Sequence, residues 1–239
     1  MTLLDLSLPS PAENLACDEV LLDLCDEGEI GGVLRFWEPC EPFVVVGYAN
    51  SVDLEVNTSF CAKAGIPIFR RCSGGGTVLQ ARGCLNYSVV LRMDSAPELA
   101  GIHTTNGFVL RKIADAMARV LNQRVDIRGQ TDLALSNLKI AGNAQRRKKA
   151  ALLFHGCLLL DLDLHLVQQA LASPSRQPDY RGNRSHLEFM TNTRAPAAPI
   201  KTALTLEWKA QAGTFAPPLE QIGRLAREKY ESFQWNHRF

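Results

Sequence analysis

The 239-residue sequence contains no uninterrupted apolar run of 18 residues, and its start, MTLLDLSLPSPAEN, lacks the basic segment that opens a signal peptide. We therefore expect no membrane span and a cytoplasmic location. The charges almost cancel, with 26 Lys+Arg against 25 Asp+Glu, so the chain has no overall positive field for binding nucleic acid. The seven cysteines are odd in number and form no Cys-x-x-Cys pair, which argues against a disulfide framework or a zinc ribbon and predicts reduced thiols.

Internal repeats and low-complexity linkers are also absent. Because 46% of the residues are hydrophobic and a chain of this length buries about 70–75% of its unfolded surface, the sequence is long enough for a full core. One domain over residues 1–239 is the simplest organisation.

The order of expected elements predicts an α/β (α+β) fold, with mixed β-sheets and helices packed on them. Ser10, Pro11 and Glu13 have the spacing of a capping box at the start of a helix. Strands at 33–39 and 43–49 are separated by two prolines, which suits a tight connection, and residues 67–92 predict strand, glycine loop, strand, strand. Further elements are a helix at 103–123 capped by a threonine, β-segments at 131–137, 138–145 and 152–164 with a turn at 136–137, a loop at 194–200, and a final proline-started helix from 217.

Three successive glycines, Gly74 to Gly76, form the most unusual segment. They allow close backbone approach and leave N–H groups free for an anion. Arg70 and Arg71 stand directly before them, where a guanidinium could bind phosphate. The segment has neither the lysine of a P-loop nor the glycine spacing of a Rossmann turn, so the glycines alone fit a plain tight turn equally well.

Three other groups have a functional and a plain interpretation. Lys139, in a strand that is otherwise apolar, is either a site lysine or a solvated edge residue. His155 and Cys157 share one face of a strand and could form a thiol–imidazole pair, although a buried histidine beside a small apolar cysteine is commoner. The run RRKK at 146–149 could bind nucleic acid but fits a solvated loop better.

Considered together, RRCSGGGTVLQARGCLNYS at 70–88 and LKIAGNAQRR with LLFHGCLLLDLDL at 138–164 resemble the two signatures of the lipoate–protein ligase family. NLACDEVLL at 14–22 and FVVVGYANSVDLEVN at 43–57 are similar to its first helix and second β unit, so the resemblance covers residues 10–165. Two positions depart from the family pattern, Gln80 where histidine is common and Cys157 where threonine stands. Residues 165–239 look like a helical end of the catalytic fold, so we expect the family's C-terminal accessory domain to be absent.

The resemblance implies a biotin/lipoate protein ligase-like catalytic domain that converts lipoate, or octanoate, and ATP to acyl-adenylate and pyrophosphate. The acyl group would then pass to the lysine of a lipoyl carrier domain, such as those of 2-oxoacid dehydrogenases or the glycine cleavage H protein. It also implies Mg²⁺ on the phosphates and allows for a separate accessory protein. No nucleic acid or membrane partner is expected.

The resemblance also assigns roles to individual residues. Lys139 would be catalytic, and Asp132 would contact metal or nucleotide. The nucleotide would be bound by Arg71, Gly76, Thr77, Val78, Leu79 and Lys139, and the acyl substrate by Arg71, Ser73, Gly74, Gly75, Asn86, Gly142, Ala144, His155 and Gly156.

Octanoyltransferases of the same fold are the main alternative, because they use no ATP and carry the acyl group on a cysteine thiolate. One type has this cysteine just before the segment that corresponds to 131–137, but residues 122–130, NQRVDIRGQ, contain none. The other type has it after the His-Gly strand, where no cysteine follows Cys157, so Cys157 would have to serve. A biotin–protein ligase is disfavoured because its G-R-G-R-x-G loop is missing, and a noncatalytic module that binds lipoyl carriers is the alternative from a different class.

Overall fold

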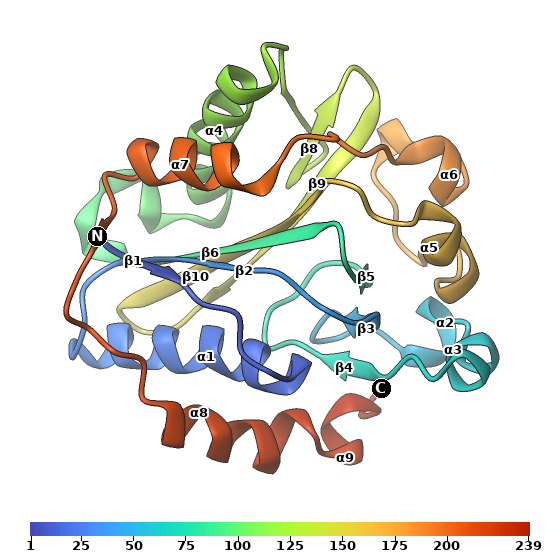
Figure 1. The fold of residues 1–239 in the computed structure, drawn as a ribbon, viewed down its shortest axis with the longest axis horizontal. Helices are drawn as coiled ribbons and strands as arrows, with labels where there is room; N and C mark the ends of the chain where they lie inside the picture. Colours follow the sequence, from blue (N-terminus) through green and yellow to red (C-terminus); the bar gives the residue numbers. More distant parts are fainter.

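The computed structural model describes residues 1–239 and contains two β-sheets with helices on both sides (Figure 1). The larger sheet has eight strands in the order β11-β1-β2-β6-β10-β9-β8-β7, and the smaller has three in the order β4-β3-β5. The bounds in the larger sheet are β1 (Thr2–Asp5), β2 (Val33–Trp37), β6 (Cys84–Arg92), β7 (Asp126–Arg128), β8 (Asp132–Leu135), β9 (Leu138–Arg147), β10 (Ala151–Leu159) and β11 (Gln211–Ala212). Those in the smaller sheet are β3 (Phe43–Val46), β4 (Ile68–Arg70) and β5 (Val78–Gln80). Parallel and antiparallel pairs occur in both sheets, which confirms the expected mixed α/β fold.

Two helical layers cover the larger sheet (Figure 1). One holds α1 (Pro11–Glu27) and α8 (Leu219–Leu225), which continues as a π-helical turn over 226–230. The opposite layer holds α4 (Ile102–Leu121) and α7 (Ala197–Glu207). A separate apolar cluster lies under each layer, so the sheet is buried on both faces.

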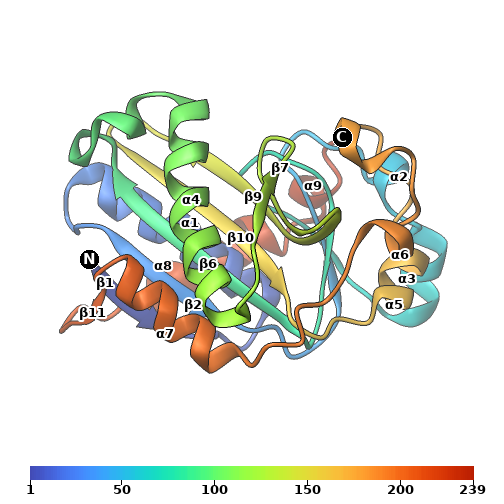
Figure 2. The same cartoon turned by 90° about the horizontal axis from the view of Figure 1, so that it is seen from above.

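The remaining helices are short. Four of them, α2 (Val52–Glu55), α3 (Thr58–Ala64), α5 (Leu164–Ala170) and α6 (His186–Phe189), lie together at one end of the molecule, beside the smaller sheet (Figure 2). The last helix, α9 (Phe233–Asn236), packs against β4, and short 3₁₀ turns occupy Met93–Ser95, Pro97–Ala100 and Asp179–Arg181. None of the helices combines the length and the hydropathy needed to span a bilayer.

Several local predictions are confirmed. The Ser10 hydroxyl accepts a hydrogen bond from the Glu13 backbone N–H, and the Glu13 carboxylate accepts one from the Ser10 N–H, so the capping box is present. Ser136 has a φ of 55° in the expected turn between β8 and β9. All seven cysteines are unpaired.

The expected strands at 33–39 and 43–49 form as β2 and β3 with a short connection, and the segment with Pro39 and Pro42 carries the chain from the larger sheet to the smaller one. Two other local predictions are wrong. Gly101, not a threonine, is the N-cap of α4 and makes no side-chain cap bond. The expected loop at 194–200 becomes α7 from residue 197, because Pro199 lies in the first helical turn, where its missing N–H is not needed.

Candidate active site

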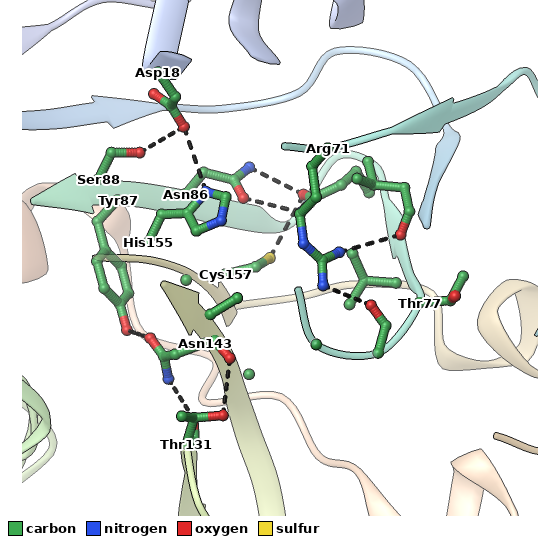
Figure 3. Close-up of a pocket in the computed structure, with 18 of the residues that line it drawn as sticks. Asp18, Arg71, Thr77, Asn86, Tyr87, Ser88, Thr131, Asn143, His155 and Cys157 are labelled. Carbon is green, nitrogen blue, oxygen red and sulfur yellow. Dashed lines mark hydrogen bonds and ion pairs between the residues drawn. The ribbon is translucent and has the colours of Figure 1, made fainter. Parts of the chain in front are cut away.

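A cavity of about 150 Å³ is bordered by both sheets, by α1 and by the glycine loop, residues 71–77 (Figure 3). The tertiary structure brings most predicted site residues to it, although they come from four separate stretches of the chain. Those that border the cavity are Arg71, Gly75, Gly76, Thr77, Val78, Asn86, Asp132, Lys139, Gly142, Ala144, His155 and Gly156. Ser73, Gly74 and Leu79 do not border it.

The glycine loop is folded around the Arg71 guanidinium. The Arg71 Nη2 donates to the carbonyl oxygens of Gly74 at 2.6 Å and Gly76 at 2.7 Å. Gly75 has a φ of 86°, and a Cβ atom at Gly47 would overlap the Gly75 carbonyl oxygen. Glycine is required at both places, because the loop needs a left-handed residue and a close backbone contact.

Arg71 is only 8% exposed, and no carboxylate is paired with it. Burial lowers its pKa from the usual 12.5 to about 10, so the guanidinium stays charged at neutral pH. A buried cation that borders a cavity and lacks an acidic partner favours an anionic ligand there.

Arg70 does not reach the cavity, contrary to the expectation that either arginine could bind phosphate. Its guanidinium is fully buried and donates to backbone carbonyls on two sides, including Gly47 and Asn50 on one and Trp235 and Asn236 on the other. Arg70 therefore fastens the C-terminal segment to the loop that follows β3.

Lys139 lies at the polar end of the cavity and is not a solvated edge residue. Its Nζ is 2.8 Å from Asp132 Oδ1, and the Tyr180 hydroxyl donates to Asp132 Oδ2 at 2.8 Å. A Cβ atom at Gly142 would lie 2.9 Å from the Lys139 Nζ, so the glycine leaves room for the ammonium group. No group of three or more His, Cys, Asp or Glu side chains is placed to hold a metal, and the metal or nucleotide contact of Asp132 stays a prediction.

A buried charged network that the sequence reading missed forms another wall (Figure 3). Asp18 of α1 pairs with Arg35 of β2 at 2.6 Å and accepts from the Ser88 hydroxyl at 2.7 Å. The His155 Nδ1 is 3.6 Å from Asp18 Oδ2, and its Nε2 is 2.6 Å from the Ser73 hydroxyl oxygen. Two signals could have found the network, since Asp18 interrupts the apolar stripe of a helix and Arg35 interrupts an apolar strand.

A second polar cluster that the sequence reading missed contains Tyr87, Thr131 and Asn143 (Figure 3). The Tyr87 hydroxyl donates to Asn143 Oδ1, and the Asn143 side-chain amide donates to the Thr131 carbonyl oxygen at 2.7 Å. A Cβ atom at Gly156 would overlap Asn143 Oδ1 and would lie 2.6 Å from the Tyr87 hydroxyl oxygen. Gly156 therefore makes the space in which this cluster forms.

The two departures from the family pattern are in contact. Gln80 and Asn86 exchange a pair of amide hydrogen bonds of 2.9 and 3.0 Å, and the Cys157 thiol donates to Gln80 Oε1 at 3.5 Å. The adjacent Cys84 thiol and burial together raise the pKa of Cys157 well above its usual value. The His155 nitrogens face Ser73 and Asp18, so the structure contains no thiol–imidazole pair.

The chain is similar both to lipoate–protein ligases and to an octanoyltransferase. The family model for the lipoyl protein ligase A/B catalytic domain matches residues 10–205. The chain is 32% identical to octanoyltransferase LipM of Lysinibacillus sphaericus over 95% of both chains. It is similar to a solved bi-partite lipoate protein ligase from Thermoplasma acidophilum, described with its E2 lipoyl domain, with a TM-score of 0.81, 25% identity, and coverage of 99% of this chain and 95% of that one. It is also similar to a crystal structure of lipoate-protein ligase A bound with ATP, with a TM-score of 0.82, 25% identity, and coverage of 99% and 98%.

The side chains around Gly156 leave no room for a methyl group, so a larger residue there should lower the stability of the fold. Gly156→Ala inserts a methyl group between the Asn143 and Tyr87 side chains, and overpacking of this kind costs about 1–3 kcal/mol. We expect a lower unfolding midpoint in thermal denaturation. Gly31→Ala is the matched control, because no atom lies within 4 Å of a Cβ at that position, and equal midpoints for the two variants would contradict the prediction.

Proposed function

The chain belongs to the family of lipoyl protein ligase A/B catalytic domains, and from that premise we propose that it is an ATP-dependent lipoate–protein ligase. Residues 1–239 form one catalytic domain that activates lipoate, or octanoate, as the acyl-adenylate. The carboxylate of the acid attacks the α-phosphorus of ATP, and the bond to pyrophosphate breaks. The ε-amino group of a carrier lysine then attacks the acyl carbon, AMP leaves, and the nitrogen loses a proton.

The burial of the cysteines favours this proposal over the transferase alternative. A transferase needs an accessible thiolate beside the acyl group, because the thiolate is the nucleophile. Only Cys157 borders the cavity, and it is 8% exposed with a strongly raised pKa. Five other cysteines are buried outside the cavity, and the exposed Cys40 does not border it either. Because no cysteine presents an exposed thiolate to the cavity, the acyl group needs another form of activation, which ATP supplies.

The charged groups of the cavity suit adenylation. Negative charge accumulates on the α-phosphate during the reaction, and fixed cations with backbone N–H donors stabilise it. Arg71, the glycine loop and Lys139 all border the cavity. Lys139 would stabilise the developing charge and Arg71 would bind the phosphates of ATP, and the similarity to an ATP-bound ligase supports this use. Mg²⁺ would be held mainly by the ATP phosphates, with Asp132 as the protein carboxylate at the polar end.

Lipoyl carrier domains are the proposed protein partners, with a lysine as the acyl acceptor. The likeness to a bi-partite ligase described with its E2 lipoyl domain supports this choice. It also supports a second polypeptide that assists the activation step.

A direct experiment separates the two activities. The purified chain is incubated with a lipoyl domain and either ATP, Mg²⁺ and lipoate, or octanoyl-carrier protein without ATP, and the lipoyl domain is weighed by mass spectrometry. We expect the lipoyl domain to gain the mass of one lipoyl group in the incubation with ATP, Mg²⁺ and lipoate, and no mass in the incubation without ATP. Octanoylation without ATP would overturn the ligase in favour of the transferase. A further incubation with preformed lipoyl-adenylate measures the transfer step apart from activation.

Lys139 is expected to be essential for adenylation. Lys139→Ala removes a fixed cation from the developing charge, and the loss of one such group costs about 10²–10³ in rate. Pyrophosphate release from ATP and lipoate measures the step. Lys148→Ala is the control, because this lysine pairs with Asp23 at 2.5 Å outside the cavity, and its rate should be unchanged. Near wild-type adenylation by Lys139→Ala would refute the assignment.

Cys157 is expected to be a packing residue of the cavity wall. Cys157→Ser keeps a small side chain that can donate to Gln80 Oε1, so it should retain adenylation and transfer within about threefold. The same assay applied to Cys157→Thr tests whether the wall tolerates the larger side chain. Loss of activity in both variants, together with an acyl thioester on Cys157 in the wild-type chain, would instead identify the covalent intermediate of a transferase.

A further inference from the structure

A row of neighbouring polar groups connects α1 to the glycine loop along the cavity wall. It starts at the Asp18 carboxylate, 3.6 Å from the His155 Nδ1 (Figure 3). It then passes through the His155 ring and the Ser73 hydroxyl and ends at the Arg71 guanidinium. We propose that Asp18 is a positioning residue that orients the Arg71 guanidinium through His155 and Ser73. The consequence for catalysis rests on the proposed function, in which Arg71 binds the nucleotide.

The Asp18 end of the row is an ionised carboxylate in a fixed position. The Asp18 side chain is 3% exposed, and its two oxygens accept from Arg35 and Ser88 at 2.6 and 2.7 Å. Burial opposes ionisation, but Arg35 and the bonds from His155 and Ser88 outweigh it and lower the pKa of Asp18. The third group that faces this carboxylate is the His155 Nδ1, at 3.6 Å.

This charge determines which nitrogen of His155 carries the proton. An ionised carboxylate can only accept, so at 3.6 Å it favours the tautomer in which the Nδ1 that faces it carries the proton. In the neutral ring the Nε2 is then an acceptor, and the Ser73 hydroxyl, 2.6 Å away, donates to it. With its proton directed to His155, the Ser73 oxygen accepts from the Arg71 Nε at 3.1 Å. Every donor in the row therefore faces an acceptor.

The same contacts exclude more direct roles for the intermediate residues. His155 borders the cavity, but its two nitrogens face Asp18 and Ser73, so neither is free to take a proton from substrate. Ser73 is fully buried and does not border the cavity, so it is not a nucleophile. The row can therefore only hold the Arg71 guanidinium in place. Arg71 is the one member of the row whose charge has no partner on the protein.

Asp18→Asn is the direct test. The amide oxygen can still accept from Arg35, which turns the amide NH₂ toward His155 and makes its Nδ1 the acceptor. We expect long-range nitrogen–proton NMR correlations, assigned to His155 by their loss in His155→Gln, to change from the Nδ1–H to the Nε2–H tautomer. This measurement uses the unliganded chain, so it tests the row even if the proposed ligase reaction fails.

The kinetic readout applies to the adenylation step. In the proposed function Arg71 binds the phosphates of ATP before and during the reaction, and Lys139 stabilises the charge that develops. Misplacement of Arg71 therefore raises KM for ATP by about tenfold and changes kcat little. Asp23→Asn is the matched control, because it removes a carboxylate of the same helix that pairs with Lys148 instead. Its KM and the tautomer of His155 should both equal those of the wild-type chain.

Ser73→Ala keeps the test valid if Asp18→Asn fails to fold, because it interrupts the row and leaves the Asp18–Arg35 pair intact. We expect it to raise KM for ATP to the same extent, and Asp18→Asn combined with Ser73→Ala to be no worse than Ser73→Ala alone. An unchanged tautomer in Asp18→Asn, an unchanged KM in Ser73→Ala, or additive effects in the double variant would each overturn the proposal. Absence of both adenylation and transfer from preformed lipoyl-adenylate by the wild-type chain would refute the ligase function and leave the tautomer result as the test of the row.

Discussion

The buried ion pair between Asp18 and Arg35 is the interaction on which the rest of the site depends. It joins α1 to β2, and through Ser88 and His155 it reaches β6 and β10. Arg35 also donates to the carbonyl oxygens of Leu6 and Asn14, so its remaining donors are satisfied. Removing one partner of such a pair leaves a buried charge uncompensated and costs about 3–5 kcal/mol. The pair therefore holds the helix that closes one side of the cavity.

The adjacent Arg70 and Arg71, at the end of β4, have different roles. Successive residues of an extended chain point to opposite sides, so Arg70 and Arg71 cannot face the same ligand. Arg70 satisfies its donors on backbone carbonyls of the C-terminal segment and the loop after β3, whereas Arg71 faces the cavity and carries a charge without an acidic partner. The first is a structural clamp, and the second is the positive centre of the proposed nucleotide site.

The proposed ligase chemistry rests on how the cysteines are buried. Cys157 stands where the family pattern has threonine, and it contacts Gln80, the other departure from that pattern. The two changes are thus neighbours in one polar cluster with Asn86. This arrangement gives the thiol a packing and hydrogen-bonding role, and it gives the site no exposed thiolate. The chain is similar to an octanoyltransferase, yet its cavity carries cations that suit a ligase. Both can hold because proteins with one fold can carry different reactive groups.

Local features of the fold followed from the sequence by itself, because they depend on neighbouring residues. These include the capping box of α1, the glycine loop between β4 and β5, the turn at Ser136, and the two signatures that indicated the family. Most residues that border the cavity were expected from the resemblance to that family. Only the tertiary structure decided that β2 and β3 join different sheets, that Arg70 faces away from the cavity, and that Asp18 lies within reach of His155. The physical reason is that these contacts join residues 20 to 166 positions apart, and which partner satisfies a buried charge or donor is determined by packing rather than by local preference.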